Sequence, residues 1–526
     1  MRRRVTKLCG SVYLIGGILV SLILSSGINA APLIVNVDGR EQTSLNGRWQ
    51  AIIDPYEVGY YNYRYEPRED GFFMNKKPAS KRDLVEYDFD ASEPLNVPGD
   101  WNTQRENLFF YEGTVWYKKS FEYRLKPKKR LFLYFGAVNY EAIVYLNGEE
   151  IGRHTGGFTP FNMEITGTLK SGENILVLKV DNRRQRAGVP AVNTDWWNYG
   201  GITRRVLLVE TPRTFVRDYA VHLNPDNPRQ ITGWLRLDGR EIEQEAQVYI
   251  PEANLRRRFR TDKHGYGEFA FPANVSRWSP DNPRLYEVQV ITASDTVTDR
   301  IGFRTIEAEG QQILLNGEPI FLRGISIHEE APFRTGRANR PQDAQTLFGW
   351  AEELGCNYVR LAHYPHNEYM LREADRRGLL VWAEIPVYWN ILWENEETYN
   401  LSEQQLSEMI SRDRNRASVI IWSVANETPR SGARLKFLRR LIDKARDMDP
   451  TRMISAATEL SRDGNRVALD DPLGNYLDVI GANEYFGWYS NEMESIPKIR
   501  WSSSYYKPLI ISEFGAAALP GYPAHA

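Results

Sequence analysis

Cysteine is nearly absent from this chain of 526 residues, which contains only Cys9 and Cys356. Cys9 falls in an N-terminal segment that we expect to be cleaved, so the mature chain would keep one cysteine and no internal disulfide. A zinc site built on several thiolates is excluded for the same reason. The fold must therefore depend on its hydrophobic cores for stability.

The chain also lacks an excess of charge of either sign. Its 66 Lys and Arg residues nearly balance its 68 Asp and Glu residues, which leaves a formal net charge of -2. This balance gives no electrostatic reason to expect nucleic acid or an anionic membrane surface as a partner. The sequence leaves open whether the chain forms a homo-oligomer.

Long hydrophobic runs are missing except at the N-terminus, where one covers residues 8–24. Basic residues precede this run and a short segment ending in Ala30 follows it, which is the three-part pattern of a signal peptide. We therefore expect residues 1–30 to be removed, leaving a secreted or periplasmic protein with no membrane partner. A retained membrane anchor is the alternative, although the run is short for a bilayer span and contains glycines.

The length of the chain predicts several domains, because single hydrophobic cores stop growing at roughly 250–300 residues. From residue 31 to residue 212, short strands are separated by turns such as Asn147-Gly148, which predicts an all-β sandwich. Residues 213–305 form a second all-β stretch of about the length of an immunoglobulin-like sandwich.

The pattern changes after residue 305, where apolar strand-like runs alternate with helical segments such as 342–354 and 432–447. This alternation predicts a parallel sheet covered by helices, and its repetition favours a (β/α)8 TIM barrel over residues 306–526. Seven strands are expected, at residues 321–329, 358–365, 379–386, 419–427, 453–459, 478–485 and 508–515. Because the last β/α unit is missing, we expect the barrel to be C-terminally truncated, with closure by another chain as the alternative.

Two glutamates end expected barrel strands, Glu427 on the fourth and Glu513 on the seventh. Active sites of such barrels lie at these strand ends, and strands four and seven face each other across the opening. Two facing carboxylates suit glycoside hydrolysis, and a separation of about 5–5.5 Å implies retention through a covalent intermediate. We assign Glu427 as the acid/base and Glu513 as the nucleophile. The alternative is a pair of ordinary strand-end carboxylates in surface ion pairs.

Three neighbours of these glutamates are candidate substrate-binding residues. Asn426 is expected to hydrogen-bond a sugar 2-hydroxyl, or to act only as a strand-end cap. Tyr485 would donate its hydroxyl to Glu513, or pack as an aromatic at the barrel rim. Arg360 would pair with Glu513, or neutralise a buried carboxylate of the barrel.

Two histidines end the first and second expected strands, His328 and His363. Either could contact sugar hydroxyls, and either could be a core histidine with its hydrogen bonds satisfied. Glu384, which ends strand three, is expected to be structural. Asp195, with Trp196 beside it, would reach the pocket from the neighbouring domain, or belong to an aromatic cluster under a loop.

Motifs occur along nearly the whole mature chain: LNGRW at 45–49, VWY at 115–117, GGFTPF at 156–161, NYVRLAHYP at 357–365, ANE at 425–427 and EFG at 513–515. Together they resemble glycoside hydrolase family 2. The resemblance implies that the first domain is a sugar-binding β jelly roll, the second immunoglobulin-like and the third a catalytic TIM barrel.

Three further segments resemble the β-glucuronidases of that family more than its large β-galactosidases: DWWNYGGI at 195–202, HEEA at 328–331 and NEYFGWY at 483–489. The match implies site roles for Asp195, His328, Asn426, Glu427, Tyr485 and Glu513. The Asn-x-Lys motif with which these enzymes read a substrate carboxylate would lie beyond Ala526. The sugar, whether glucuronic acid, galactose or another, is therefore undefined.

These observations favour a retaining exo-β-glycosidase that acts on a carbohydrate substrate and needs no cofactor. A metal-dependent hydrolase would typically carry His-x-His on strand one, whereas this chain has His328-Glu329-Glu330, so no metal site is expected. A non-catalytic carbohydrate-binding protein or an inactive fragment is the other alternative, and the missing eighth strand is its main support.

Overall fold

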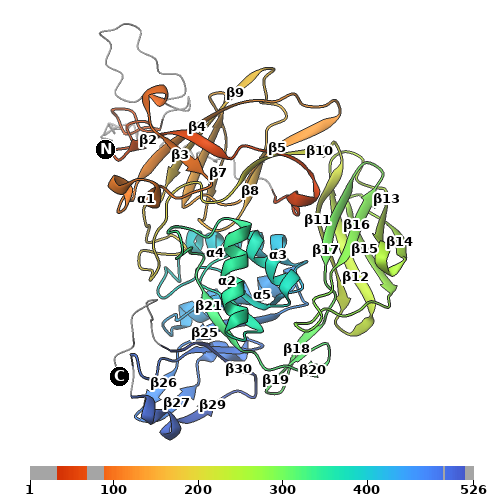
Figure 1. Ribbon diagram of the computed structural model, residues 1–526, viewed down its shortest axis with the longest axis vertical. Helices are drawn as coiled ribbons and strands as arrows, with labels where there is room; N and C mark the ends of the chain where they lie inside the picture. Colours follow the sequence, from red (N-terminus) through yellow and green to blue (C-terminus); the bar gives the residue numbers. More distant parts are fainter. Residues whose placement is uncertain (1–31, 68–87, 490–491, 516–526) are drawn as a thin grey trace, which may run out of the picture.

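The computed structural model describes residues 32–67, 88–489 and 492–515, so the expected signal peptide, residues 1–30, lies outside the described residues. Three domains follow one another along the chain, two built of β-strands and one barrel (Figure 1). The N-terminal domain lies above the barrel in this view, and the second β domain lies beside both. Within the described residues, no helix is both long enough and apolar enough to cross a membrane.

The N-terminal domain is a sandwich of two antiparallel sheets, as the alternating strand pattern predicts. One sheet has the order β3 (Pro94–Val97), β2 (Gly47–Asp54), β4 (Thr114–Glu122), β9 (Glu173–Asp181), β6 (Glu141–Leu146), β7 (Glu149–Thr155). The other has the order β1 (Glu41–Ser44), β10 (Val206–Pro212), β5 (Lys129–Phe135), β8 (Phe161–Glu164). The core between them is large and aromatic, with Trp49, Tyr117 and Phe135 among its buried residues.

The second domain is a smaller sandwich, consistent with an immunoglobulin-like fold. Its first sheet has the order β11 (Phe215–Asn224), β12 (Asn227–Asp238), β15 (Tyr266–Pro272). Its second has the order β14 (Leu255–Arg260), β13 (Glu245–Ile250), β16 (Tyr286–Thr292), β17 (Thr296–Ile301). Inward-facing residues alternate with exposed ones along β15, which is the pattern of a sheet with one face on a core.

The third domain contains a seven-stranded, all-parallel sheet curled into a nearly closed TIM-like barrel. Its order is β21 (Gly324–Ile327), β22 (Tyr358–Leu361), β23 (Leu380–Glu384), β24 (Val419–Asn426), β25 (Met453–Thr458), β28 (Ile480–Asn483), β30 (Leu509–Glu513). A small sheet of β18 (Ile306–Glu309), β19 (Gln312–Leu315) and β20 (Glu318–Pro319) precedes it. Ile306 and Ile313 of this small sheet pack against Trp382 and Ile421 of the barrel.

The helices differ from the expected alternation in the second half of the barrel. Four cover the first half: α2 (Pro341–Glu353), α3 (Glu368–Arg377), α4 (Glu396–Asp413) and α5 (Gly432–Met448). After β25 the described chain has instead 3-10 turns and a sheet of β26 (Ser461–Asp463), β27 (Arg466–Leu469) and β29 (Arg500–Ser503). These crossovers therefore cover the barrel with strands and turns rather than with helices.

The two ends of the barrel sheet, β21 and β30, lie close to each other. The Ser326 hydroxyl donates a hydrogen bond to the backbone oxygen of Ser512 at 3.0 Å. A groove of about 1320 Å³ runs along both strands, lined by apolar side chains such as Leu322 and Ile511 and reaching Glu513. The first and seventh strands thus approach each other near the active end, and among the described residues a groove separates the rest of the two strands.

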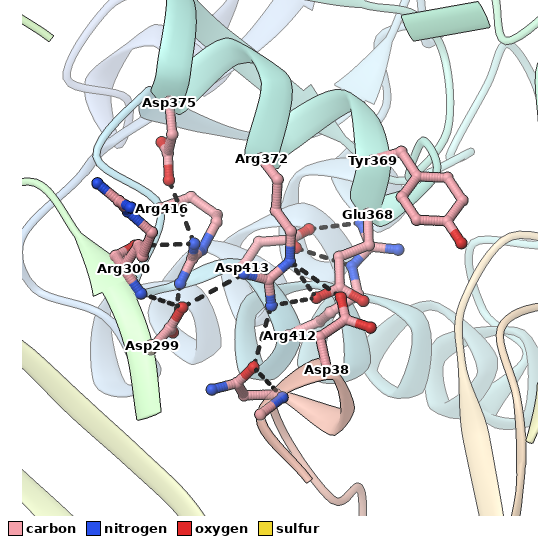
Figure 2. A network of polar contacts seen from close by, with 12 residues as sticks. Asp38, Asp299, Arg300, Glu368, Tyr369, Arg372, Asp375, Arg412, Asp413 and Arg416 are labelled. Carbon is pink, nitrogen blue, oxygen red and sulfur yellow. Dashed lines mark hydrogen bonds and ion pairs between the residues drawn. The ribbon is translucent and has the colours of Figure 1, made fainter. Parts of the chain in front are cut away.

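A network of buried and partly buried polar groups joins the three domains (Figure 2). Arg372 of α3 donates to Glu368 at 2.7 Å, to Asp299 of the second domain at 3.3 Å and to Asn36 of the N-terminal region at 3.1 Å. Burial opposes the charge of Arg372, but Glu368 and Asp299 outweigh it and raise its pKa. Because each domain contributes a charge or dipole, the network fixes the orientation of the domains around the barrel.

Candidate active site

Glu427 and Glu513 both lie at the mouth of the barrel. Glu427 follows β24 directly and has the left-handed backbone angle φ 46°, while Glu513 ends β30. Asn483, the last residue of β28, places its side-chain nitrogen 3.0 Å from Glu427 Oε1 and 2.9 Å from Glu513 Oε1. The two oxygens are therefore at most about 6 Å apart, which fits the short carboxyl separation of a retaining glycosidase.

Glu513 is surrounded by hydrogen-bond donors. Arg360 Nη1 lies 2.6 Å from its Oε1, and the Tyr485 hydroxyl donates to its Oε2. Burial and the neighbouring Glu513 raise the pKa of Tyr485, so the phenol stays protonated as a donor. A carboxylate held by a cation, a phenol and an amide suits the nucleophile rather than the proton donor.

Arg360 also binds a second carboxylate beneath the site. Its Nε donates to Glu384 Oε1 at 3.0 Å, and its Nη2 donates to Asn426 Oδ1 at 2.6 Å. Burial opposes ionisation of Glu384, but Arg360 and His363 outweigh it and lower the pKa of Glu384 to about 2. Both sequence interpretations of Arg360 therefore describe contacts that it makes: it pairs with Glu513 and it neutralises a buried barrel carboxylate.

Asn426 is held by its oxygen, which leaves its amide nitrogen available. That nitrogen is buried and has no hydrogen-bond partner among the described residues. It lies next in sequence to Glu427, and Asn483 contacts the same side-chain oxygen at 3.3 Å. A buried donor at this position is suited to receive a sugar hydroxyl, because a lost hydrogen bond in a buried site is costly.

Asp195, His328 and His363 come together from two domains. One polar atom from each lies within 4.8 Å of the others. The Trp196 ring lies 5.8 Å from that of His363 and 4.9 Å from that of Tyr388, so the N-terminal loop packs on the barrel mouth. Burial and the nearby His363 lower the pKa of His328 to about 3, which keeps its ring neutral. Imidazole nitrogens and a carboxylate suit sugar hydroxyls, and the same three groups could hold a metal ion.

Two residues of the site were not among the sequence candidates. Asn483 ends a barrel strand in a polar side chain, so the strand-end rule that selected the glutamates applies to it as well. Trp389 donates its indole N–H to Glu427 Oε2 at 3.0 Å. It follows β23 in a loop that carries no periodic or motif signal, and only the folded chain places it beside Glu427.

Two carboxylates at retaining distance, one of them paired with an arginine and a tyrosine at the end of a barrel strand, define a glycoside hydrolase site. Three models of one family match the chain: "Glycosyl hydrolases family 2, sugar binding domain" over residues 43–212, "Glycosyl hydrolases family 2" over 225–304 and "Glycosyl hydrolases family 2, TIM barrel domain" over 306–526. The chain belongs to glycosyl hydrolases family 2, and within it the protein is a β-glucuronidase-like glycosidase.

Several proteins to which this chain is similar are β-glucuronidases. The β-glucuronidase of Paenibacillus borealis is 27% identical over 92% of this chain and 84% of its own length. The β-glucuronidase of Mus musculus is 29% identical over 81% of this chain and 72% of its own. Among solved structures, a β-glucuronidase from an uncultured Clostridium species superposes with a TM-score of 0.75 at 26% identity, covering 94% of this chain and 86% of that chain.

Proposed function

We propose that this protein removes a terminal β-linked uronic acid, primarily glucuronic acid, from a glycoside with retention of the anomeric configuration. The observation that carries the mechanism is the shared contact of Asn483 with both carboxylates, which sets their separation at no more than about 6 Å. The names of the relatives support the sugar. One solved β-glucuronidase, from Ruminococcus gnavus at 26% identity, is in complex with an N1-substituted uronic isofagomine.

In the first step the Glu513 carboxylate attacks the anomeric carbon while Glu427 gives its proton to the glycosidic oxygen. The bond to the leaving group breaks, and the sugar is bound to Glu513 as an ester. In the second step Glu427 takes a proton from water, the water oxygen attacks the same carbon and Glu513 leaves as a carboxylate. Two displacements restore the original configuration.

Exo action is supported by the way the N-terminal loop meets the barrel. Trp196 packs against Tyr388 and His363, and Asp195 lies beside the two histidines. A terminal sugar placed between the two carboxylates would contact these groups with the side of its ring that points away from the glycosidic bond and carries free hydroxyls. Export of the protein by its N-terminal residues 1–30 is part of the same proposal and is tested by sequencing the N-terminus of the mature protein.

The decisive experiment measures hydrolysis of 4-nitrophenyl β-glucuronide, β-galacturonide, β-galactoside and β-glucoside by the wild type and by Glu513→Gln. We expect the uronides to be preferred, and the variant to lose activity by roughly a thousandfold or more. Proton NMR of the first product should show the β-anomer. Initial release of the α-anomer would contradict retention, and equal rates for wild type and variant would contradict the nucleophile.

A further inference from the structure

The backbone that carries Trp389 is tied to the strand that carries Glu427. The Asn426 N–H donates to Val387 O at 2.9 Å, and the Trp389 N–H donates to Asn426 O at 3.0 Å. The segment after β23 therefore stays paired with the end of β24 as far as the residue before Glu427. These backbone hydrogen bonds hold Trp389 in a fixed position relative to Glu427, the proposed acid/base.

Trp389 and Glu427 are also both in the left-handed backbone region, at φ 51° and φ 46°. Neither residue type adopts this conformation readily, because the Cβ atom crowds the backbone. Such residues persist where the surrounding structure determines them, and they cluster at active sites. The paired distortion turns the two side chains toward each other.

The contact between the two side chains is a hydrogen bond from the indole N–H of Trp389 to Glu427 Oε2 at 3.0 Å. The other oxygen, Oε1, accepts from Asn483 at 3.0 Å. Donors on both oxygens fix the plane of the carboxyl group. Each oxygen keeps a second lone pair, so the group can still face the glycosidic oxygen.

The position of the leaving group follows from the same geometry. The glycosidic oxygen must come within about 2.6–3.2 Å of the Glu427 carboxyl to take its proton. The leaving group continues from that oxygen, away from the sugar held between the two glutamates. The Trp389 indole is bonded to the same carboxyl, and the residue is 37% exposed, so part of its ring borders the space that the leaving group must cross.

The Trp389 ring has a firm support on its inner side. Its centroid lies 4.6 Å from that of Tyr388, with 36° between the planes. Tyr388 in turn packs against Trp196 and His363, with centroids 4.9 Å away in both cases. A supported, partly exposed indole offers a flat apolar surface, which suits the face of a pyranose or an aryl ring.

We propose that Trp389 forms the leaving-group subsite, stacking against a sugar or aryl leaving group, and that its N–H orients Glu427 for proton transfer. The proposal rests on the proposed function, because it needs Glu427 to act as the acid. It separates two roles of one side chain: the N–H acts through Glu427 and the ring acts on the leaving group.

Two substitutions separate these roles. Trp389→Phe keeps an aromatic surface and removes the donor, and Trp389→Ala removes both. Trp393→Phe is the matched control, because Trp393 lies in the same loop and its indole N–H donates to Asn390 at 3.1 Å. The substrates are a series of β-glucuronides whose leaving groups run from 4-nitrophenol to phenol and a simple alcohol, plus a disaccharide.

For Trp389→Phe we expect kcat/KM on alkyl and phenyl glucuronides to fall by roughly ten- to a hundredfold, with a smaller fall on 4-nitrophenyl glucuronide. A good leaving group needs little protonation, so a disoriented acid affects it least. Trp389→Ala should in addition raise KM for the aryl and disaccharide substrates, while Trp393→Phe should match the wild type.

Equal losses on every leaving group would overturn the orienting role, and unchanged KM values in Trp389→Ala would overturn the subsite. Thermal unfolding of each variant shows whether it is folded. If Trp389→Ala does not fold, the kinetics of Trp389→Phe alone test the orienting role. A wild type inactive on the whole series would overturn the proposed function and this inference with it. If the wild type is active but both Trp389 variants behave like the Trp393→Phe control, the inference alone is overturned and the proposed function stands.

Discussion

Glu427 and Glu513 accept hydrogen bonds from the same amide nitrogen, that of Asn483, at 3.0 Å and 2.9 Å. Glu427 directly follows β24 and Glu513 ends β30, and Asn483, the last residue of β28, supplies the amide. One neutral side chain thereby sets the distance between two groups that would otherwise repel each other when both are ionised.

Removing this shared donor should weaken catalysis without abolishing it. We expect Asn483→Ala to lower kcat/KM by about ten- to a hundredfold, because both carboxylates lose a restraint on their position. Asn483→Asp should lower it further, since a third carboxylate would repel the other two. Steady-state kinetics measure both, with Asn475→Ala on the surface as the control. Wild-type activity in Asn483→Asp would contradict the role given to Asn483.

The phenol of Tyr485 should act as a protonated donor throughout the working pH range. Its pKa is raised by burial and by Glu513, whereas an ordinary tyrosine titrates near about pH 10. Tyr485→Phe should therefore lower kcat by a similar factor at about pH 6 and at about pH 9. A loss that vanishes at the alkaline end would mean that the wild-type phenol had already ionised there.

His328 should make the stability of the protein depend on pH below neutrality. Its pKa falls from an ordinary 6.5 to about 3 in the folded protein, so the unfolded chain binds a proton in this window that the folded chain does not. The contribution of His328 therefore lowers the free energy of unfolding as the pH falls from about 6.5 towards about 3. The decrease is at most about 1.4 kcal/mol per pH unit. His328→Gln should remove that part of the slope in urea unfolding at about pH 5 and about pH 7. An identical slope in the variant would contradict the prediction.

The ion network between the domains should contribute strongly to stability through Arg372. Its removal takes one cationic partner from Asp299 and one from Glu368, which keep Arg416 and Arg205, so we expect a cost below the about 3–5 kcal/mol of a fully broken buried pair. We expect Arg372→Met to lower the thermal unfolding midpoint clearly. Arg440→Ala, which breaks an exposed pair with Glu396, should cost less than about 1 kcal/mol. Similar midpoints for the two variants would show that the network does not hold the domains together.

The cluster of Asp195, His328 and His363 should bind substrate without a metal ion. Two carboxylates supply acid, base and nucleophile in the proposed mechanism, so none of its steps calls for a Lewis acid. Dialysis against a chelator should leave kcat/KM unchanged. Loss of activity that a divalent ion restores would instead assign the cluster to a metal, as its spacing permits.

Much of the fold could be predicted from local patterns. Alternation of apolar residues marks the strands of the two sandwiches, and the run of apolar strands marks the barrel, because a side chain's direction follows its place in the strand. The same regularity places Glu427 and Glu513 at strand ends. The absence of helices after β25 among the described residues was not predicted, since no hydrophobic period in that segment separates turns and short strands from a helix.

Sequence patterns were enough to identify the two glutamates, the barrel strands that position them and the family to which their motifs are similar. The folded chain was needed to show that Asn483 contacts both glutamates, that Arg360 binds two carboxylates and that Trp389 contacts Glu427. These contacts join residues far apart in sequence, from 24 positions between Arg360 and Glu384 to 153 between Arg360 and Glu513. Local periodicity fixes which way a side chain points, but the partner that it meets depends on how whole strands and domains pack.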